Sequence, residues 1–146
     1  STPLYSSAAS DVYKRQSYML LLLRMIGGSM MIYNHGWGKI TAGPEKWNRL
    51  GHALTDIIGF EFLSTFFGFM AAFSESVCAL LIVIGLFTIP ASILLSFTMF
   101  VAIMNHIIDN ELPELAIMYC LLLLVLIVSG PGNYSLDQKW FFKTKN

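Results

Sequence analysis

The residues of this chain that could carry chemistry are a few ionisable side chains set within long apolar stretches. Arg24 and Glu75 are the clearest cases, because each lies well inside such a stretch. An ionisable group inside a membrane span costs roughly 2.5–3.5 kcal/mol on insertion scales, so it usually faces the interior of a helix bundle and has a partner. We therefore expect both side chains to face inward, where they could form a direct or water-bridged ion pair.

Helical spacing places several of these groups on shared faces. A rotation of about 100° per residue puts Arg24 and His35 on one stripe of the first apolar stretch, about three turns apart. In the second stretch Gly68 and Ala72 share a face with Glu75. Small residues on that face would allow another helix to approach closely.

The expected depth of these groups indicates where a ligand would bind. At a rise of about 1.5 Å per residue, His35, His106 and Glu114 lie toward the side opposite the chain termini. Glu75 lies somewhat deeper. This convergence predicts a pocket open from the outer leaflet, in which an amphipathic ligand such as a quinone places its head among His35, Glu75 and His106. The residues predicted to bind a quinone or a lipid are Arg24, His35, Glu75, His106 and Glu114.

Other interpretations of the same residues remain open. Arg24 and Glu75 could be a purely structural pair, with His106 hydrogen-bonded at a helix interface and Glu114 favoured by a helix N-terminus. His35 and His106 could ligate haem, but two histidines alone are a weak signal. A metal site has no diagnostic spacing here and is not predicted. The sequence has no phosphate-binding loop, nucleophile elbow or paired-cysteine motif, and it specifies no catalytic residue.

The elements that must position these residues are four apolar segments of about the 20 residues that cross a bilayer core. They run over residues 18–38, 63–87, 90–108 and 112–129. Pro90 and Pro113 suit the first turn of a helix. Between the first two segments, residues 41–59 carry apolar side chains at helical spacing, which is typical of an amphipathic helix lying in the interface. The predicted fold is an all-α integral membrane four-helix bundle with an interfacial amphipathic helix between spans 1 and 2.

The composition supports this class. The 146 residues are 55% hydrophobic and 12% charged, with a mean hydropathy of +0.64, which is too apolar for an ordinary soluble domain. The net charge is zero, so no basic excess suggests nucleic-acid binding. Cys78 and Cys120 each lie inside an apolar run, and we expect both to be free thiols.

The first sixteen residues do not fit this pattern. "SSAASDVYKRQ", residues 6–16, is polar and unpatterned, and it is the codon-for-codon translation of an adapter widely used in transposase-based DNA library preparation. We therefore expect residues 1–16 to be non-native sequence and residues 17–146 to form one membrane domain.

The orientation in the membrane is weakly specified by charge. Lys39, Lys46 and Arg49 lie on one side and Lys139, Lys143 and Lys145 on the other, a tie under the positive-inside rule. Arg24 could extend toward the N-terminal side, which favours both termini in the cytoplasm.

With these residues described, the chain resembles the DoxX family of small four-span bacterial membrane proteins. The matching stretches are "LLRMIGGSMMIYNHGWGK", "FGFMAAFSE" and "GPGNYSLD", with Met99 and His106 between them. The resemblance implies a bacterial inner-membrane protein. The family's name comes from a subunit associated with a thiosulfate:quinone oxidoreductase, and other members are linked to quinones, thiols or oxidative stress.

The resemblance implies a quinone-interacting subunit of a membrane oxidoreductase system, working with a partner protein that carries the redox cofactor. Its cofactor would be a quinone rather than haem, and homo-oligomerisation is compatible with it. The alternative is a non-catalytic membrane module that binds lipid or organises a protein complex.

Overall fold

A computed structural model describes residues 4–142 of the protein, and these form helices and turns without a strand. Three residues of the predicted adapter segment, 1–3, lie outside the described residues, as do Lys143 and Lys145 of the charge count. The all-α class is therefore confirmed for the part of the chain that the structure describes.

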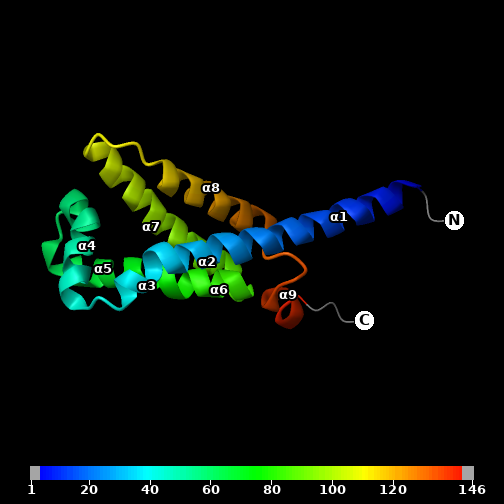
Figure 1. Ribbon diagram of the computed structural model, residues 1–146, viewed down its shortest axis with the longest axis horizontal. Helices are drawn as coiled ribbons and strands as arrows, with labels where there is room; N and C mark the ends of the chain where they lie inside the picture. Colours follow the sequence, from blue (N-terminus) through cyan, green and yellow to red (C-terminus); the bar gives the residue numbers. More distant parts are fainter. Residues whose placement is uncertain (1–3, 143–146) are drawn as a thin grey trace.

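The first half of the bundle begins with one continuous helical rod. It consists of α1 (Leu4–Leu22), a π-helical turn η1 (Leu23–Gly27), α2 (Gly28–Met31), a second π turn η2 (Ile32–Gly36) and α3 (Trp37–Ile40). The residues at the internal junctions keep right-handed helical backbone angles, so the rod is not broken. Residues 5–16 are exposed along their whole length, and this end of α1 projects beyond the other helices (Figure 1).

The rest of the chain adds a short crossing helix and three further rods. Their bounds are α4 (Pro44–Ile58), the 3-10 turn η3 (Glu61–Leu63), α5 (Ser64–Phe73), the π turn η4 (Ser74–Cys78), α6 (Ala79–Ile84), α7 (Thr88–Ile108), α8 (Glu114–Ser129) and α9 (Leu136–Trp140). Segments η3 to α6 follow each other directly and form the second rod, and α7 and α8 are the third and fourth. In Figure 1 α7 and α8 lie side by side as an antiparallel pair.

Two of the described helices are long and apolar enough to cross a membrane, Glu61–Ile84 and Thr88–Ile108. Glu114–Ser129 is also apolar but shorter. Only 22% of the most apolar stretch of α7 is buried. Such an apolar helix, largely uncovered by protein, needs hydrocarbon around it, which supports a membrane location. The four-span arrangement as a whole stays a prediction.

The ends of these helices differ by a few residues from the predicted bounds, for local reasons. The second rod ends at Ile84 because Gly85 takes a left-handed backbone conformation, with φ of 74°. Helix α7 begins at Thr88, before Pro90, because the Asp137 carboxylate accepts hydrogen bonds from the backbone N–H groups of Phe87 and Thr88, at 2.7 and 2.8 Å.

The predicted amphipathic helix is present as α4, and it packs unusually closely on α5. A Cβ atom on Gly51 would lie 1.7 Å from the carbonyl oxygen of Ser64, and one on Gly68 would lie 1.6 Å from that of Trp47. The two backbones therefore touch at two points where no side chain fits. The hydroxyls of Thr55 and Ser64, 3.0 Å apart, add a buried hydrogen bond. Helix α4 is thereby fixed on α5.

The hydrophobic core lies among the first rod, α6, α7 and α8. Its buried members are Leu20, Met31, Cys78, Ala79, Ile82, Ala91, Leu95, Met99, Tyr119, Leu123 and Leu126. Cys78 and Cys120 are both free, as predicted.

Candidate functional site

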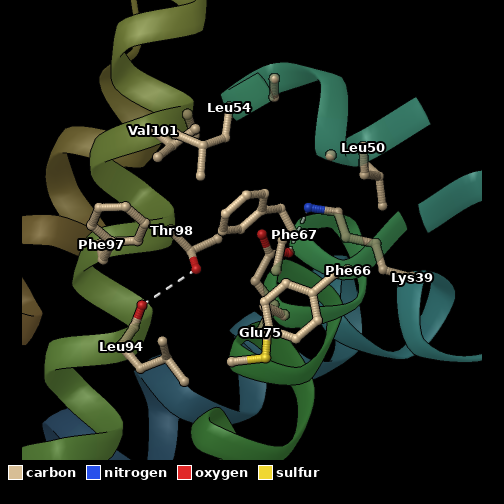
Figure 2. A pocket seen from close by; sticks show the side chains of 15 residues that line it. Lys39, Leu50, Leu54, Phe66, Phe67, Glu75, Leu94, Phe97, Thr98 and Val101 are labelled. Atoms are coloured by element: carbon tan, nitrogen blue, oxygen red, sulfur yellow. Dashed lines mark hydrogen bonds and ion pairs between the residues drawn. The ribbon is translucent and has the colours of Figure 1, made fainter. Parts of the chain in front are cut away.

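The strongest polar feature inside the bundle is an ion pair between Lys39 and Glu75. Lys39 Nζ donates a hydrogen bond to Glu75 Oε2 at 2.6 Å. The Glu75 side chain is 4% exposed and that of Lys39 is 25% exposed, so the carboxylate is enclosed while the ammonium keeps a path to the surroundings. Lys39 comes from α3 and Glu75 from the π turn η4 (Figure 2). Such π turns are often found at functional sites.

The expected pair between Arg24 and Glu75 is wrong, because the register of the first two rods places Lys39 beside the carboxylate instead. A Cβ on Gly36 would lie 2.1 Å from the carbonyl oxygen of Glu75, so the two backbones touch at this point. Lys39 follows Gly36 by about one turn. Arg24 precedes Gly36 by twelve residues, which is roughly 18 Å of helix.

Arg24 is buried at the other end of the rod, where it holds the segment that follows α8. Its side chain is 1% exposed, and Nη2 donates to the carbonyl oxygen of Tyr134. A Cβ on Gly85 would lie 1.8 Å from Arg24 Nη1, so this glycine makes room for the guanidinium. Asp137 provides the nearby negative charge and also caps α7. These contacts indicate a structural role for Arg24.

The ion pair forms one end of a cavity of about 290 Å³ enclosed by α4, α5 and α7. Ligand cavities commonly measure about 300–1,000 Å³, so this one is at the small end of that range. Its lining residues are Lys39, Leu50, Gly51, Ala53, Leu54, Phe66, Phe67, Met70, Ala71, Glu75, Leu94, Phe97, Thr98, Val101 and Ala102.

The cavity wall is apolar apart from the ion pair and one hydroxyl. Thr98 donates to the carbonyl of Leu94 at 3.3 Å (Figure 2). It also bonds to the hydroxyl of Ser74 at 2.7 Å, so its hydrogen-bonding capacity is largely used. The free polar chemistry of the cavity is therefore that of one ammonium and one carboxylate.

The other sequence-predicted residues lie elsewhere. His35 packs edge-on against the ring of Tyr119 in α8, with centroids 6.2 Å apart. His106 is exposed and its Nδ1 is 2.8 Å from Glu111 Oε2 in the turn between α7 and α8. His106 and Glu114 together line a separate hollow at that turn. Of the five predicted ligand-binding residues, Glu75 alone lines the cavity beneath α4.

Lys39 is the residue that sequence reasoning missed. From the sequence, Lys39 has a place in the family pattern and among the charges that orient the chain, but no ligand-binding role, although it follows His35 by four residues and so continues the same helical stripe. That i, i+4 relation was the available signal. Within residues 4–142, no three histidine, cysteine, aspartate or glutamate residues gather in a way that could hold a metal ion.

Comparison with known proteins gives a family and one relative. The model of the DoxX family matches residues 19–107. The chain is also similar to an uncharacterised protein of Haemophilus influenzae, at 30% identity over 143 residues, which cover 92% of this chain and 99% of that protein. No solved structure matches the chain.

Proposed function

The chain belongs to the DoxX family of membrane proteins, and from that premise we propose that it is a quinone-interacting subunit of a membrane oxidoreductase system linked to thiol or oxidative stress. The observation that supports this most is the apolar cavity closed at one end by the ion pair of Lys39 and Glu75. The partner protein would carry the redox cofactor. The setting we propose is a bacterial inner membrane crossed four times, with both termini in the cytoplasm.

The chemistry of the cavity suits a quinone headgroup. A quinone is neutral and flat, and each of its carbonyl oxygens can accept a hydrogen bond from the Lys39 ammonium. In the reduced form, the hydroxyl groups can donate to the Glu75 carboxylate. Both are charge-assisted hydrogen bonds, which are stronger than neutral ones. The ring of Phe67, which also lines the cavity, offers aromatic surface to the headgroup.

Quinone binding to the purified protein tests this proposal. We use decylubiquinol, the reduced form whose hydroxyl groups can donate to Glu75, as the probe and measure its dissociation constant in lipid nanodiscs. Glu75→Gln removes one charge-assisted hydrogen bond worth about 1.5–3 kcal/mol, which predicts a loss of affinity of roughly 10- to 150-fold. His106→Gln, outside the cavity, is the control and should bind as the wild type does.

The double variant Lys39→Met/Glu75→Leu separates fold from function. Replacing both charges by apolar groups leaves no buried charge unpaired, so this protein is expected to stay folded and yet lose quinone affinity. Binding equal to that of the wild type in both variants would refute the role of this cavity.

A second candidate function is a non-catalytic module that binds lipid or organises a protein complex. A separate observation favours it: a groove of about 640 Å³ between the first rod and α8 is lined almost wholly by apolar atoms. Its residues include Met19, Met30 and Met118, whose flexible side chains adapt to irregular partners. Extraction of the gently purified protein, with a visible absorption spectrum, distinguishes the two. Bound quinone or haem would favour a redox role, and phospholipid alone would favour the module.

A further inference from the structure

We infer that the ligand of the cavity enters sideways from the lipid, between Phe66 of α5 and Phe97 of α7. It would then be a long-tailed amphiphile whose tail stays in the bilayer while its head reaches Lys39 and Glu75. This inference rests on the proposed quinone-binding function, and it adds the class of quinone and the route of entry.

The mouth of the cavity is identified by exposure. Among the lining residues, Phe66 and Phe97 are the two that are exposed, at 56% and 53%. Each lies on one of the two described helices that are long and apolar enough to cross a membrane. The mouth therefore opens where hydrocarbon is expected to surround the protein, and the two exposed residues that mark it are apolar.

The opposite route, past α4, is closed by fixed contacts. Helix α4 touches α5 backbone to backbone at Gly51 and Gly68. It is also tied to α7, because Asn105 Nδ2 donates to the carbonyl oxygen of Ala53 at 2.7 Å. A second bond within α7, to the carbonyl oxygen of Val101 at 2.9 Å, holds the Asn105 side chain in place. Because α4 is held to both of its neighbours, we expect it to stay in place rather than to open. Entry between α5 and α7, unlike entry past α4, breaks no backbone contact.

The size of the cavity indicates which part of the ligand it holds. A volume of about 290 Å³ takes a headgroup and the start of a tail, but not a long isoprenoid chain. The remaining tail would pass out between the two phenylalanine rings. The tail then serves mainly to concentrate the ligand in the lipid phase, from which the protein is loaded.

Variants of Phe97 test the route. Phe97→Trp narrows the mouth and Phe97→Ala widens it, without touching the ion pair. We measure the exchange rate of a fluorescent long-tailed ubiquinone in phosphatidylcholine proteoliposomes. Exchange should become at least about fivefold slower with tryptophan and faster with alanine, while the dissociation constant changes by less than about threefold. Phe100 is a matched control, because it is 54% exposed on the same helix but does not line the cavity. Phe100→Trp and Phe100→Ala should exchange at the wild-type rate.

The ligand class is tested in the same vesicles with tail-less ubiquinone-0. It should bind at least about tenfold more weakly than the long-tailed probe at equal total concentration, because little of it partitions into lipid. If Phe97 and Phe100 variants exchange alike, or if ubiquinone-0 binds as tightly, the lateral route is wrong although quinone binding stands. If the wild-type protein binds no quinone at all, the proposed function fails and this inference fails with it.

Discussion

Replacing Lys39 by methionine is expected to lower the free energy of unfolding by about 3–5 kcal/mol, because it removes the partner of a buried charge. The Glu75 side chain is 4% exposed and its ion-pair distance is 2.6 Å. Removing the other charge of the pair, with Glu75→Gln, is expected to lower the free energy of unfolding by less, about 1.5–3 kcal/mol. Lys39 is 25% exposed, and its long side chain can turn the ammonium toward water. The order of the two costs follows from the unequal burial of the two groups.

The assay is reversible unfolding in mixed detergent micelles, followed by circular dichroism. The double variant Lys39→Met/Glu75→Leu should return to within about 1 kcal/mol of the wild type, since no buried charge is left unpaired. His106 and Glu111 form a matched control pair at 2.8 Å, with side chains 47% and 65% exposed. Breaking this pair with His106→Gln should lower the free energy of unfolding by less than about 1 kcal/mol. A Lys39→Met cost no larger than that of His106→Gln, or a larger cost for Glu75→Gln, would refute this account of the pair.

The remaining predictions concern the packing, the termini and the orientation. Asp137→Ala removes the acceptor of two backbone N–H groups at the start of α7 and the negative charge near the buried Arg24, so it should lower the free energy of unfolding by about 3–5 kcal/mol in the same assay. Asp56→Ala, which breaks only the exposed pair with His52, should cost less than about 1 kcal/mol. Gly68→Ala places a Cβ 1.6 Å from a backbone oxygen of α4 and should cost about 1–3 kcal/mol or displace α4, and a neutral effect would contradict the close contact. Deleting residues 1–16 should leave membrane insertion and quinone binding unchanged, and a large loss of folded protein would show that the segment is native. A cysteine at Lys139 should resist an impermeant thiol reagent in intact cells, and ready labelling would reverse the proposed topology.

The helices themselves were predictable from the sequence, because apolar length and periodicity are properties of one segment at a time. The amphipathic pattern of residues 41–59 predicted α4 to within a few residues. Pro113 correctly marked the start of α8. These signals do not depend on how a helix packs against its neighbours.

The partner of Glu75 was not predictable in the same way. It depends on the register between two rods, which is fixed where the backbone of Gly36 meets that of Glu75. The π turns at Leu23–Gly27 and Ile32–Gly36 add a second difficulty. A π turn has more residues per turn than an α-helix, so counting about 100° per residue across two of them misplaces the face of His35 relative to Arg24.

The cavity could not be predicted from periodicity either, because it exists only where α4 folds back over α5. Two glycines, Gly51 and Gly68, allow that approach, and each has an ordinary appearance in the sequence. The predicted pocket places the head of the ligand among His35, Glu75 and His106, and of these Glu75 lines this cavity. His106 and Glu114 line a hollow of their own at the turn between α7 and α8.

The most direct test of the central claim is photo-crosslinking with an azido-quinone, followed by mass spectrometry of the labelled peptides. The account predicts labelling within residues 66–71 and 94–102, the parts of α5 and α7 that line the cavity, and competition by unlabelled quinone. Labelling confined to the hollow beside His106 and Glu114, or labelling that unlabelled quinone does not reduce, would contradict the claim that this cavity binds the quinone.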